Sequence, residues 1–189
     1  MADIMRLGDL ASSGWLIIND GYRTKKAELG MPGVPVLRVA EVQDGYITPT
    51  FGDHVSENYR RQFANKTSRE ADVIVTTKGS VGRVARIGSS DPQFVYSPQL
   101  CFFRVLDETR IDPGFLYQWF RGIEFRRQAL GVQSQTDMAP YINLTDMRSL
   151  RITLPQLSEQ RAIANLLGAL DDKIESNRQI VEKVMDLST

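Results

Sequence analysis

The sequence has very few residues of the kinds that build metal sites and disulfides. Among its 189 residues there is one cysteine, Cys101, and one histidine, His54. A single thiol cannot form an internal disulfide, and these two residues supply too few ligands for a structural zinc site. An apolar run of about 18 to 20 residues, which a membrane-spanning helix needs, is also missing. We therefore expect a cytoplasmic protein without a structural metal and without a membrane segment.

Charge of one sign is not in excess either. Lys and Arg together number 23, and Asp and Glu together also number 23, so the formal net charge is zero. This balance excludes a basic tail of the kind that binds nucleic acids. Hydrophobic residues make up 42% of the chain and charged residues 24%, which is ordinary for a folded protein. The composition predicts one folded domain with room for an appendage.

Short segments rich in β-branched and aromatic residues, separated by Gly, Pro and Asp, run through the first 153 residues. Strand-like length and composition are found in the segments 34–40, 72–77, 82–87, 100–105 and 150–154. Gly79-Ser80-Val81-Gly82 is typical of a tight hairpin between two of these strands, and residues 43–46 form a second turn signal. Because several short strands imply a sheet that curls or closes, we predict a small, mostly antiparallel, curled sheet.

Two short helices are predicted between the strands. Asp112-Pro113 is typical of a helix N-cap followed by proline at the first helical position. Helical spacing after it predicts a stripe that packs on the sheet, made of Phe115, Leu116, Trp119, Phe120 and Ile123. A second helix contains Arg126 and Arg127, and we expect Gly131 to end it as a C-cap.

Beyond Pro155 the sequence changes, because this part has no proline and one glycine. Its pattern predicts a single helix from Ser158, a good N-cap, to about Leu187. Spacings of four and three alternate along a heptad seam formed by Ile163, Leu167, Leu170, Ile174, Asn177, Val181 and Val184. Such a helix is about 45 Å long. A compact domain cannot cover the whole seam of so long a rod, so we expect a second helix, from another copy or another protein.

The predicted fold class is therefore α+β. A curled sheet domain with packed short helices occupies residues 1–153, and a long coiled-coil helix occupies residues 154–189. Asn177 has two open interpretations: it pairs with a polar group and fixes the helix register, or it lies at a half-exposed edge of the stripe. Asp171 and Asp172 flank the seam and are most simply part of a solvated face.

Arrangements typical of catalysis are not found. The segment 79–82 matches neither the dinucleotide-binding glycine pattern nor the phosphate-binding loop of nucleotide hydrolases. His54 lies in a segment typical of a surface loop, and Cys101 lies in an apolar run typical of a core cysteine. We therefore expect no enzymatic activity in this chain.

Polar and basic residues instead gather on predicted turns, where recognition residues tend to lie. Lysine and arginine can hold phosphates, and glutamine and arginine can pair with base edges. The residues that we assign to phosphate contacts are Arg23, Lys25, Lys26 and Lys78. The residues that we assign to base reading are Ser80, Arg83, Gln133, Gln135 and Thr136. For each cluster alone, a solvated surface is the simpler interpretation.

A specific motif marks the start of the long helix. It comprises Leu154-Pro155-Gln156-Leu157, then Glu159-Gln160, Ile163-Ala164 and Leu170-Asp171-Asp172. Further segments in matching order are 71–74, 78–82, 97–100, Gly131 and 141–144. In these features the chain resembles the specificity subunits of Type I restriction-modification systems. Gln156 departs from the family pattern, which has a second proline there.

This resemblance implies a non-catalytic subunit that recognises DNA. Such a subunit normally has two recognition domains, each of which reads one half of a split site. Two antiparallel helices join the domains, set the gap between the half-sites and dock the methyltransferase subunits. One domain and one helix imply a half-length subunit or a fragment, which forms a homodimer through its helix. Two-fold pairing then implies a gapped palindromic target.

The partners implied by the resemblance are double-stranded DNA, the methyltransferase (M) subunit and, through it, the restriction (R) subunit. No cofactor is expected in this chain, since S-adenosylmethionine, ATP and Mg²⁺ belong to the partner subunits. Two other interpretations stay open. The chain could be a coiled-coil adaptor or inhibitor that binds this machinery without reading DNA. It could also be a fragment of a fused methyltransferase-specificity enzyme, whose chemistry comes from elsewhere.

Overall fold

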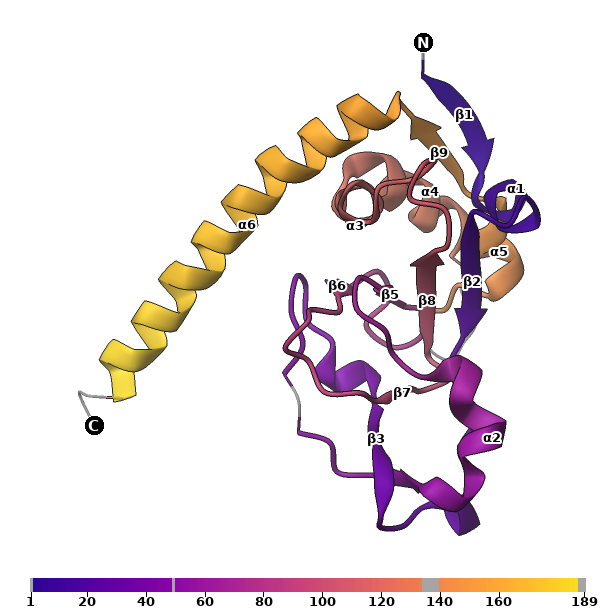
Figure 1. The fold of residues 1–189 in the computed structure, drawn as a ribbon, viewed down its shortest axis with the longest axis vertical. Helices are drawn as coiled ribbons and strands as arrows, with labels where there is room; N and C mark the ends of the chain where they lie inside the picture. The colour runs from indigo at the N-terminus through magenta and orange to yellow at the C-terminus, as the bar shows by residue number, and fades with distance from the viewer. Residues whose placement is uncertain (1, 49, 134–139, 187–189) are drawn as a thin grey trace.

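A 30-residue helix leaves one edge of a domain made of short strands and short helices (Figure 1). This computed structural model describes residues 2–48, 50–133 and 140–186. The long helix, α6 (Leu157–Asp186), starts directly after β9 (Arg151–Leu154), and its far end stands apart from the domain. The predicted fold class, an α+β domain followed by a long C-terminal helix, is confirmed. The division of the chain between residues 153 and 154 stays a prediction.

The strands are short and mostly antiparallel. They are β1 (Asp3–Arg6), β2 (Leu16–Asp20), β3 (Gly33–Leu37), β4 (His54–Ser56), β5 (Val73–Thr76), β6 (Val84–Arg86), β7 (Val95–Tyr96), β8 (Leu100–Val105) and β9. In the described residues they form three sheets, with the orders β2-β8-β5-β6, β4-β3-β7 and β1-β9. The β3 and β7 pair is parallel, and the other strand pairs of these sheets are antiparallel. The domain therefore divides its strands among small sheets.

The five predicted strands correspond to β3, β5, β6, β8 and β9, and β8 has the predicted bounds. The hairpin at residues 79–82 is confirmed, because β5 and β6 pair on either side of it. The turn at residues 43–46 is also confirmed, with the Gln43 amide donating to the Tyr46 carbonyl at 2.9 Å. The expectation that His54 lies in a surface loop is wrong. It is half-buried in β4, where Val55 enters the core and His54 pairs with Pro35.

The remaining helices are short and lie around the sheets (Figure 1). The α-helices are α1 (Leu7–Ser12), α2 (Arg60–Phe63), α3 (Pro113–Arg121), α4 (Ile123–Val132) and α5 (Leu144–Ser149). Single turns of 3₁₀-helix are η1 (Lys26–Glu28), η2 (Val39–Glu41), η3 (Glu57–Tyr59) and η4 (Ala64–Lys66).

Helix α3 begins as the sequence predicts. The Asp112 carboxylate accepts the amide of Phe115 at 2.9 Å, and proline occupies the first turn. The predicted stripe is buried as far as Phe120, but Ile123 is exposed, because the chain breaks at Gly122 and starts α4 in a new direction. Gly131 does not end α4. It lacks the positive φ of a C-cap glycine, and the helix continues to Val132.

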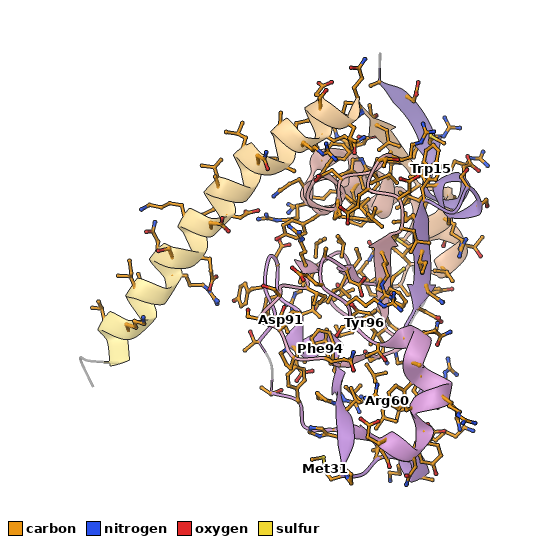
Figure 2. The ribbon with its side chains drawn as sticks, in the orientation of Figure 1. Trp15, Met31, Arg60, Asp91, Phe94 and Tyr96 are labelled. Atoms are coloured by element: carbon orange, nitrogen blue, oxygen red, sulfur yellow. The ribbon has the colours of Figure 1, made fainter. Side chains whose placement is uncertain are left out.

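The four-stranded sheet is buried on both faces at its centre. Successive side chains of a strand point to opposite faces. In β8, Phe103 therefore joins the core cluster that contains Phe120, while Phe102 joins a second cluster with Tyr96. Figure 2 labels Trp15 on one side of this sheet region and Tyr96 with Phe94 on the other. The two faces anchor α3 and α4 above the sheet and the β3 region below it.

A buried ion pair joins these layers. The Arg104 guanidinium donates to both carboxylate oxygens of Asp72, at 2.7 and 2.6 Å, and to the Thr67 carbonyl at 2.9 Å. The Tyr96 hydroxyl donates to the same carboxylate at 2.6 Å. Burial, reinforced by Asp72, raises the pKa of Tyr96, so the hydroxyl stays protonated as a donor. Because the Asp72 side chain is fully buried, these hydrogen bonds take the place of water around its carboxylate.

Candidate nucleic-acid interface

The hairpin between β5 and β6 presents several of the predicted recognition residues. Gly79 and Gly82 both adopt positive φ, which lets the chain reverse within a few residues. The buried Thr76 hydroxyl accepts the Arg83 amide at 2.9 Å and donates to the Ser80 carbonyl. These bonds fix the loop from its base. The side chains of Lys78 and Ser80 are left exposed at its tip.

The first half of the hairpin borders a hollow of about 310 Å³ that contains two of the predicted cations, Arg23 and Lys78. The backbone of Lys78 pairs with that of Tyr141, and the Ile142 amide donates to the Thr77 carbonyl at 2.9 Å. Segments about 60 residues apart in sequence thus meet here. Asp20 also lines the hollow, but its carboxylate accepts a hydrogen bond from the Lys66 ammonium group at 2.8 Å. Arg23 and Lys78 therefore give the hollow a basic rim suited to a phosphate.

The second half of the hairpin borders another hollow, of about 340 Å³, which contains Arg83 and Gln133. Both side chains are half-buried. Arg83 donates to the Val42 carbonyl at 3.2 Å, so one of its five N–H groups holds the neighbouring turn. Arg126 lies in the same hollow and pairs with Asp44 at 3.5 Å. Polar groups able to pair with base edges thus lie beside the hairpin.

Two further predicted phosphate residues lie elsewhere. Lys25 and Lys26 are exposed at the start of η1 and line neither hollow. The Lys25 amide donates to Glu28 at 2.9 Å, and its ammonium group lies 4.0 Å from the same carboxylate. Gln135 and Thr136 lie outside the described residues, so their assignment to base reading stays a prediction.

Sequence reasoning missed two residues of the first hollow, Tyr141 and Asn143. They belong to a segment matched to the family pattern, and that was the signal that could have found them. Asn143 also caps α5, because its side-chain carbonyl accepts the Asp146 amide at 2.8 Å.

The predicted seam on α6 lies mostly in solvent. Ile163 is half-buried against the domain core. The rest of the seam is exposed, with Leu170 at 55% and Ile174 at 64% of their full surface. Leu166 and Ile180 extend the exposed apolar surface. Exposed apolar surface of this extent on one helix is typical of an interaction site.

The base of α6 is held firmly by the domain. The buried side chain of Gln160 accepts the Asp112 amide at 2.9 Å and donates to the carbonyls of Arg110 and Pro155. The helix begins at Leu157, so Ser158 lies inside its first turn and is not the N-cap. The carbonyl of Gln156 accepts hydrogen bonds from the amides of Glu159 and Gln160, both at 2.9 Å. Gln160, part of the motif, therefore fixes where the helix leaves the domain.

The expectation that Asp171 belongs to a solvated face is also wrong. Its carboxylate accepts Arg121 at 2.5 Å and Gln118 at 2.7 Å, both from α3. The side chain is only 27% exposed. Tertiary packing places α3 beside this turn of α6. Asp172, one residue on, is exposed as expected.

The described part of the chain contains neither a candidate metal site nor a candidate membrane-spanning helix. Within it, no cluster of three or more His, Cys, Asp or Glu could hold a metal ion. Its helices include none long and apolar enough to cross a membrane. Cys101 is buried, and burial raises the pKa of its thiol. This favours the neutral thiol of a core residue over a reactive thiolate.

The domain thus presents a hairpin with basic and polar neighbours, and it is joined to a helix with an exposed apolar face. A family model described as the Type I restriction modification DNA specificity domain matches residues 2–185. The chain belongs to this family. The resemblance seen in the sequence is therefore confirmed, and the hairpin and α6 can be described as parts of a specificity domain.

The related specificity subunits are longer than this chain. The specificity subunit of type I restriction enzyme MjaVIII from Methanocaldococcus jannaschii is 25% identical over 172 residues, which cover 88% of this chain and 40% of that protein. The EcoBI specificity subunit of Escherichia coli is 28% identical over 148 residues, which cover 76% of this chain and 30% of that protein. The chain thus spans two fifths or less of the length of these relatives.

Solved structures share the fold. The S subunit of a Type I restriction-modification system from M. genitalium superimposes with a TM-score of 0.63 at 18% identity, over 96% of this chain and 42% of that one. A chain from a structure describing complex assembly and conformational transition of the type I system gives 0.67 at 19% identity, over 95% and 40%. The specificity domain described here thus has the architecture found in these proteins.

Proposed function

We propose that this chain is a non-catalytic, sequence-specific DNA-recognition subunit of a Type I restriction-modification complex. It reads one half of a bipartite site, and two copies assemble through α6 to read the whole site. The observation that carries the proposal is the combination, in one specificity domain, of an anchored hairpin with an exposed apolar helix. The first feature suits contact with DNA, and the second suits assembly.

DNA reading is assigned to the hairpin and the two hollows beside it. Arg23 and Lys78 hold phosphates and fix the register of the domain on the duplex. Ser80, Arg83 and Gln133 face base edges in a groove. Because the formal net charge of the chain is zero, isolated DNA affinity is weak, and partner subunits supply further phosphate contacts.

Assembly is assigned to α6. A second copy packs its helix antiparallel against the seam, so the assembled surface is two-fold symmetric and the target is a gapped palindrome. A rod of about 45 Å corresponds to about 13 base pairs at 3.4 Å each. The M subunit docks on the helix pair and brings in the R subunit. S-adenosylmethionine, ATP and Mg²⁺ are held by those subunits.

The test is to co-express the full chain with the M subunit of its own operon and to map every methylated adenine in the host genome. One gapped palindromic motif is the expected result. A stable complex with the M subunit that methylates no motif would contradict DNA reading and support an adaptor. Two unrelated half-sites would contradict pairing of identical copies. The matched control is the Gln133→Ala chain, which should keep the gap and change the bases preferred in each half-site.

A further inference from the structure

In the described residues, one face of α6 makes polar or cation–π contacts with the domain at three places, in addition to the apolar packing of Ile163 and Ala164 near its base. The side chains that make these contacts are Gln160, Asp171 and Arg178. The separations of 11 and 18 residues correspond to about three and five full helical turns, so all three project from the same face. They span about 27 Å of the helix. The domain therefore supports α6 over more than half its length.

The middle contact is the ion pair at the end of α3. The Asp171 carboxylate accepts hydrogen bonds from both Arg121 and Gln118. The Arg121 guanidinium also lies over the Tyr117 ring, 5.1 Å from the ring centre. Burial lowers the pKa of Arg121, but the bond to Asp171 and the nearby charges of Asp171, Tyr117 and Asp44 together outweigh burial, so the net change is upward. Arg121 thus carries its charge wherever the fold persists. It is held between its own helix and α6.

The outer contact joins α6 to the turn at residues 42–47. The Arg178 guanidinium lies 3.9 Å from the centre of the Tyr46 ring, in a cation–π arrangement. Tyr46, Arg178 and Asp91 border one groove between the helix and the domain. Figure 2 labels Asp91 at the edge of the domain that faces α6.

The same turn is bonded to the recognition hairpin. The Gly45 amide donates to the Val84 carbonyl at 2.7 Å, and Arg83 donates to the Val42 carbonyl at 3.2 Å. The Tyr117 hydroxyl of α3 donates to the Gly45 carbonyl at 3.4 Å. A continuous set of contacts therefore leads from the hairpin, through this turn and α3, to the outer half of α6.

Support at several points matters because α6 is a long lever. If only its base were held, a tilt of about 10° would move the far end of a 45 Å rod by about 8 Å. That displacement exceeds two base-pair steps of about 3.4 Å. In a two-copy assembly both domains would shift relative to each other by comparable amounts. A helix held at the base alone cannot define one gap between half-sites.

We propose that Tyr46, Arg121, Asp171 and Arg178 form a bracket that sets the number of base pairs between the two half-sites. The proposal rests on the proposed function, since it concerns the gap in the DNA site. The bracket residues are positioning residues: they act through the angle of α6 and do not touch bases. They determine specificity for spacing, separately from specificity for sequence.

The test compares the wild-type complex with the bracket variant Tyr46→Ala/Arg121→Ala. The substrates are duplexes that carry the two half-sites of the mapped motif, with gaps from two base pairs shorter to two longer. We expect the preference of the variant for the natural gap over the altered gaps to fall about tenfold. The preferred bases in each half-site should stay the same. The matched control, Arg127→Ala/Lys173→Ala, removes exposed cations from α4 and α6 and should keep the gap preference.

A second readout needs neither DNA nor a partner subunit. Spin labels at Asn65→Cys and Lys183→Cys, both exposed positions, report the distance from the domain to the outer part of α6. Cys101 is buried, and labelled chains are diluted with unlabelled ones so that pairs within one chain dominate. The distance distribution should be narrow in the wild type and broad in the bracket variant.

The outcomes separate this proposal from the proposed function. An unchanged gap preference in the bracket variant, with wild-type methylation intact, would overturn the spacing role alone. An unchanged distance distribution would show that these residues do not hold the helix and would overturn the bracket. A wild-type complex with no gapped motif would overturn the proposed function and the spacing role together.

Discussion

The domain and α6 differ in the kinds of side chain that they bury and expose. In the domain, even a buried aspartate has its charge compensated. The Asp72 carboxylate accepts hydrogen bonds from Arg104 and Tyr96 in the core. On α6, leucine and isoleucine side chains such as Leu170 and Ile174 lie in solvent. The domain buries an extensive apolar core and pairs the charge buried within it. The helix keeps an apolar face that the domain does not cover.

The difference indicates where stability and assembly reside. Burial of apolar surface contributes roughly 25 cal/mol per Å², so an exposed seam offers free energy that only association can release. The sheet region, in contrast, depends on close-packed neighbours within the chain. Substitutions in the first region should affect folding. Substitutions on the second should affect association and leave the fold intact.

The largest effect is expected at the buried ion pair. Asp72→Ala leaves the Arg104 charge buried without its partner, and we expect a loss of about 3–5 kcal/mol in the free energy of unfolding. Urea denaturation followed by fluorescence measures it. The exposed Asp3→Ala is the control and should change stability by less than about 0.5 kcal/mol. A loss below about 1 kcal/mol for Asp72→Ala would show that the network does not hold the layers together.

Next in size is the effect of charge on the seam. Leu170→Glu/Ile174→Glu should give a monomer of 21.3 kDa where the wild type has twice that mass, because two carboxylates cannot be buried in an apolar helix interface. Light scattering measures the mass, and an unchanged melting temperature of the domain confirms that the fold persists. Ser176→Glu, at an exposed position off the seam, should stay dimeric. If the seam variant were still dimeric, α6 would not be the assembly surface.

A smaller effect is expected where the two regions meet. Gln160→Ala removes three hydrogen bonds at the base of α6 and leaves the Asp112 amide and two carbonyls without this partner. We expect a loss of about 1–3 kcal/mol. Arg161→Ala, at the exposed neighbouring position, should have little effect. Equal stability of the two variants would show that Gln160 does not anchor the helix.

The smallest effect concerns single phosphate contacts. Lys78→Ala should weaken binding of the assembled complex to all DNA sequences alike and reduce the slope of log affinity against log salt by about one. Lys25→Ala, outside both hollows, should likewise weaken binding to all sequences and flatten the slope by about one, and an unchanged slope would show that the DNA does not reach η1. A change in sequence preference for Lys78→Ala would contradict its assignment to a phosphate.

Local patterns predicted the elements that are defined by neighbouring residues. The Asp112-Pro113 cap, the α3 stripe, the hairpin at residues 79–82 and the long helix all depend on spacings of a few residues. The strands that were missed depend on distant partners. Asp3 in β1, for example, pairs with Leu154 at the other end of the domain. A four-residue strand carries too little periodicity to reveal such a partner.

The candidate site shows the same limit. Residue type and turn position indicated Arg23 and Lys78, but their shared hollow is created by the bridge from Lys78 to Tyr141. Sequence alone also counted Asp171 among solvated residues, because its partners lie 50 and 53 residues away on α3. Charges that pair across the fold cannot be told from charges in solvent until the fold is known.

The most direct test of the account is to compare methylation maps of the wild type and the Leu170→Glu/Ile174→Glu variant, each co-expressed with its M subunit. We expect a single gapped palindrome for the wild type and loss of that motif for the variant, although its recognition domain stays folded. Methylation of the same gapped palindrome by the variant would contradict the claim that two specificity domains read DNA together through α6.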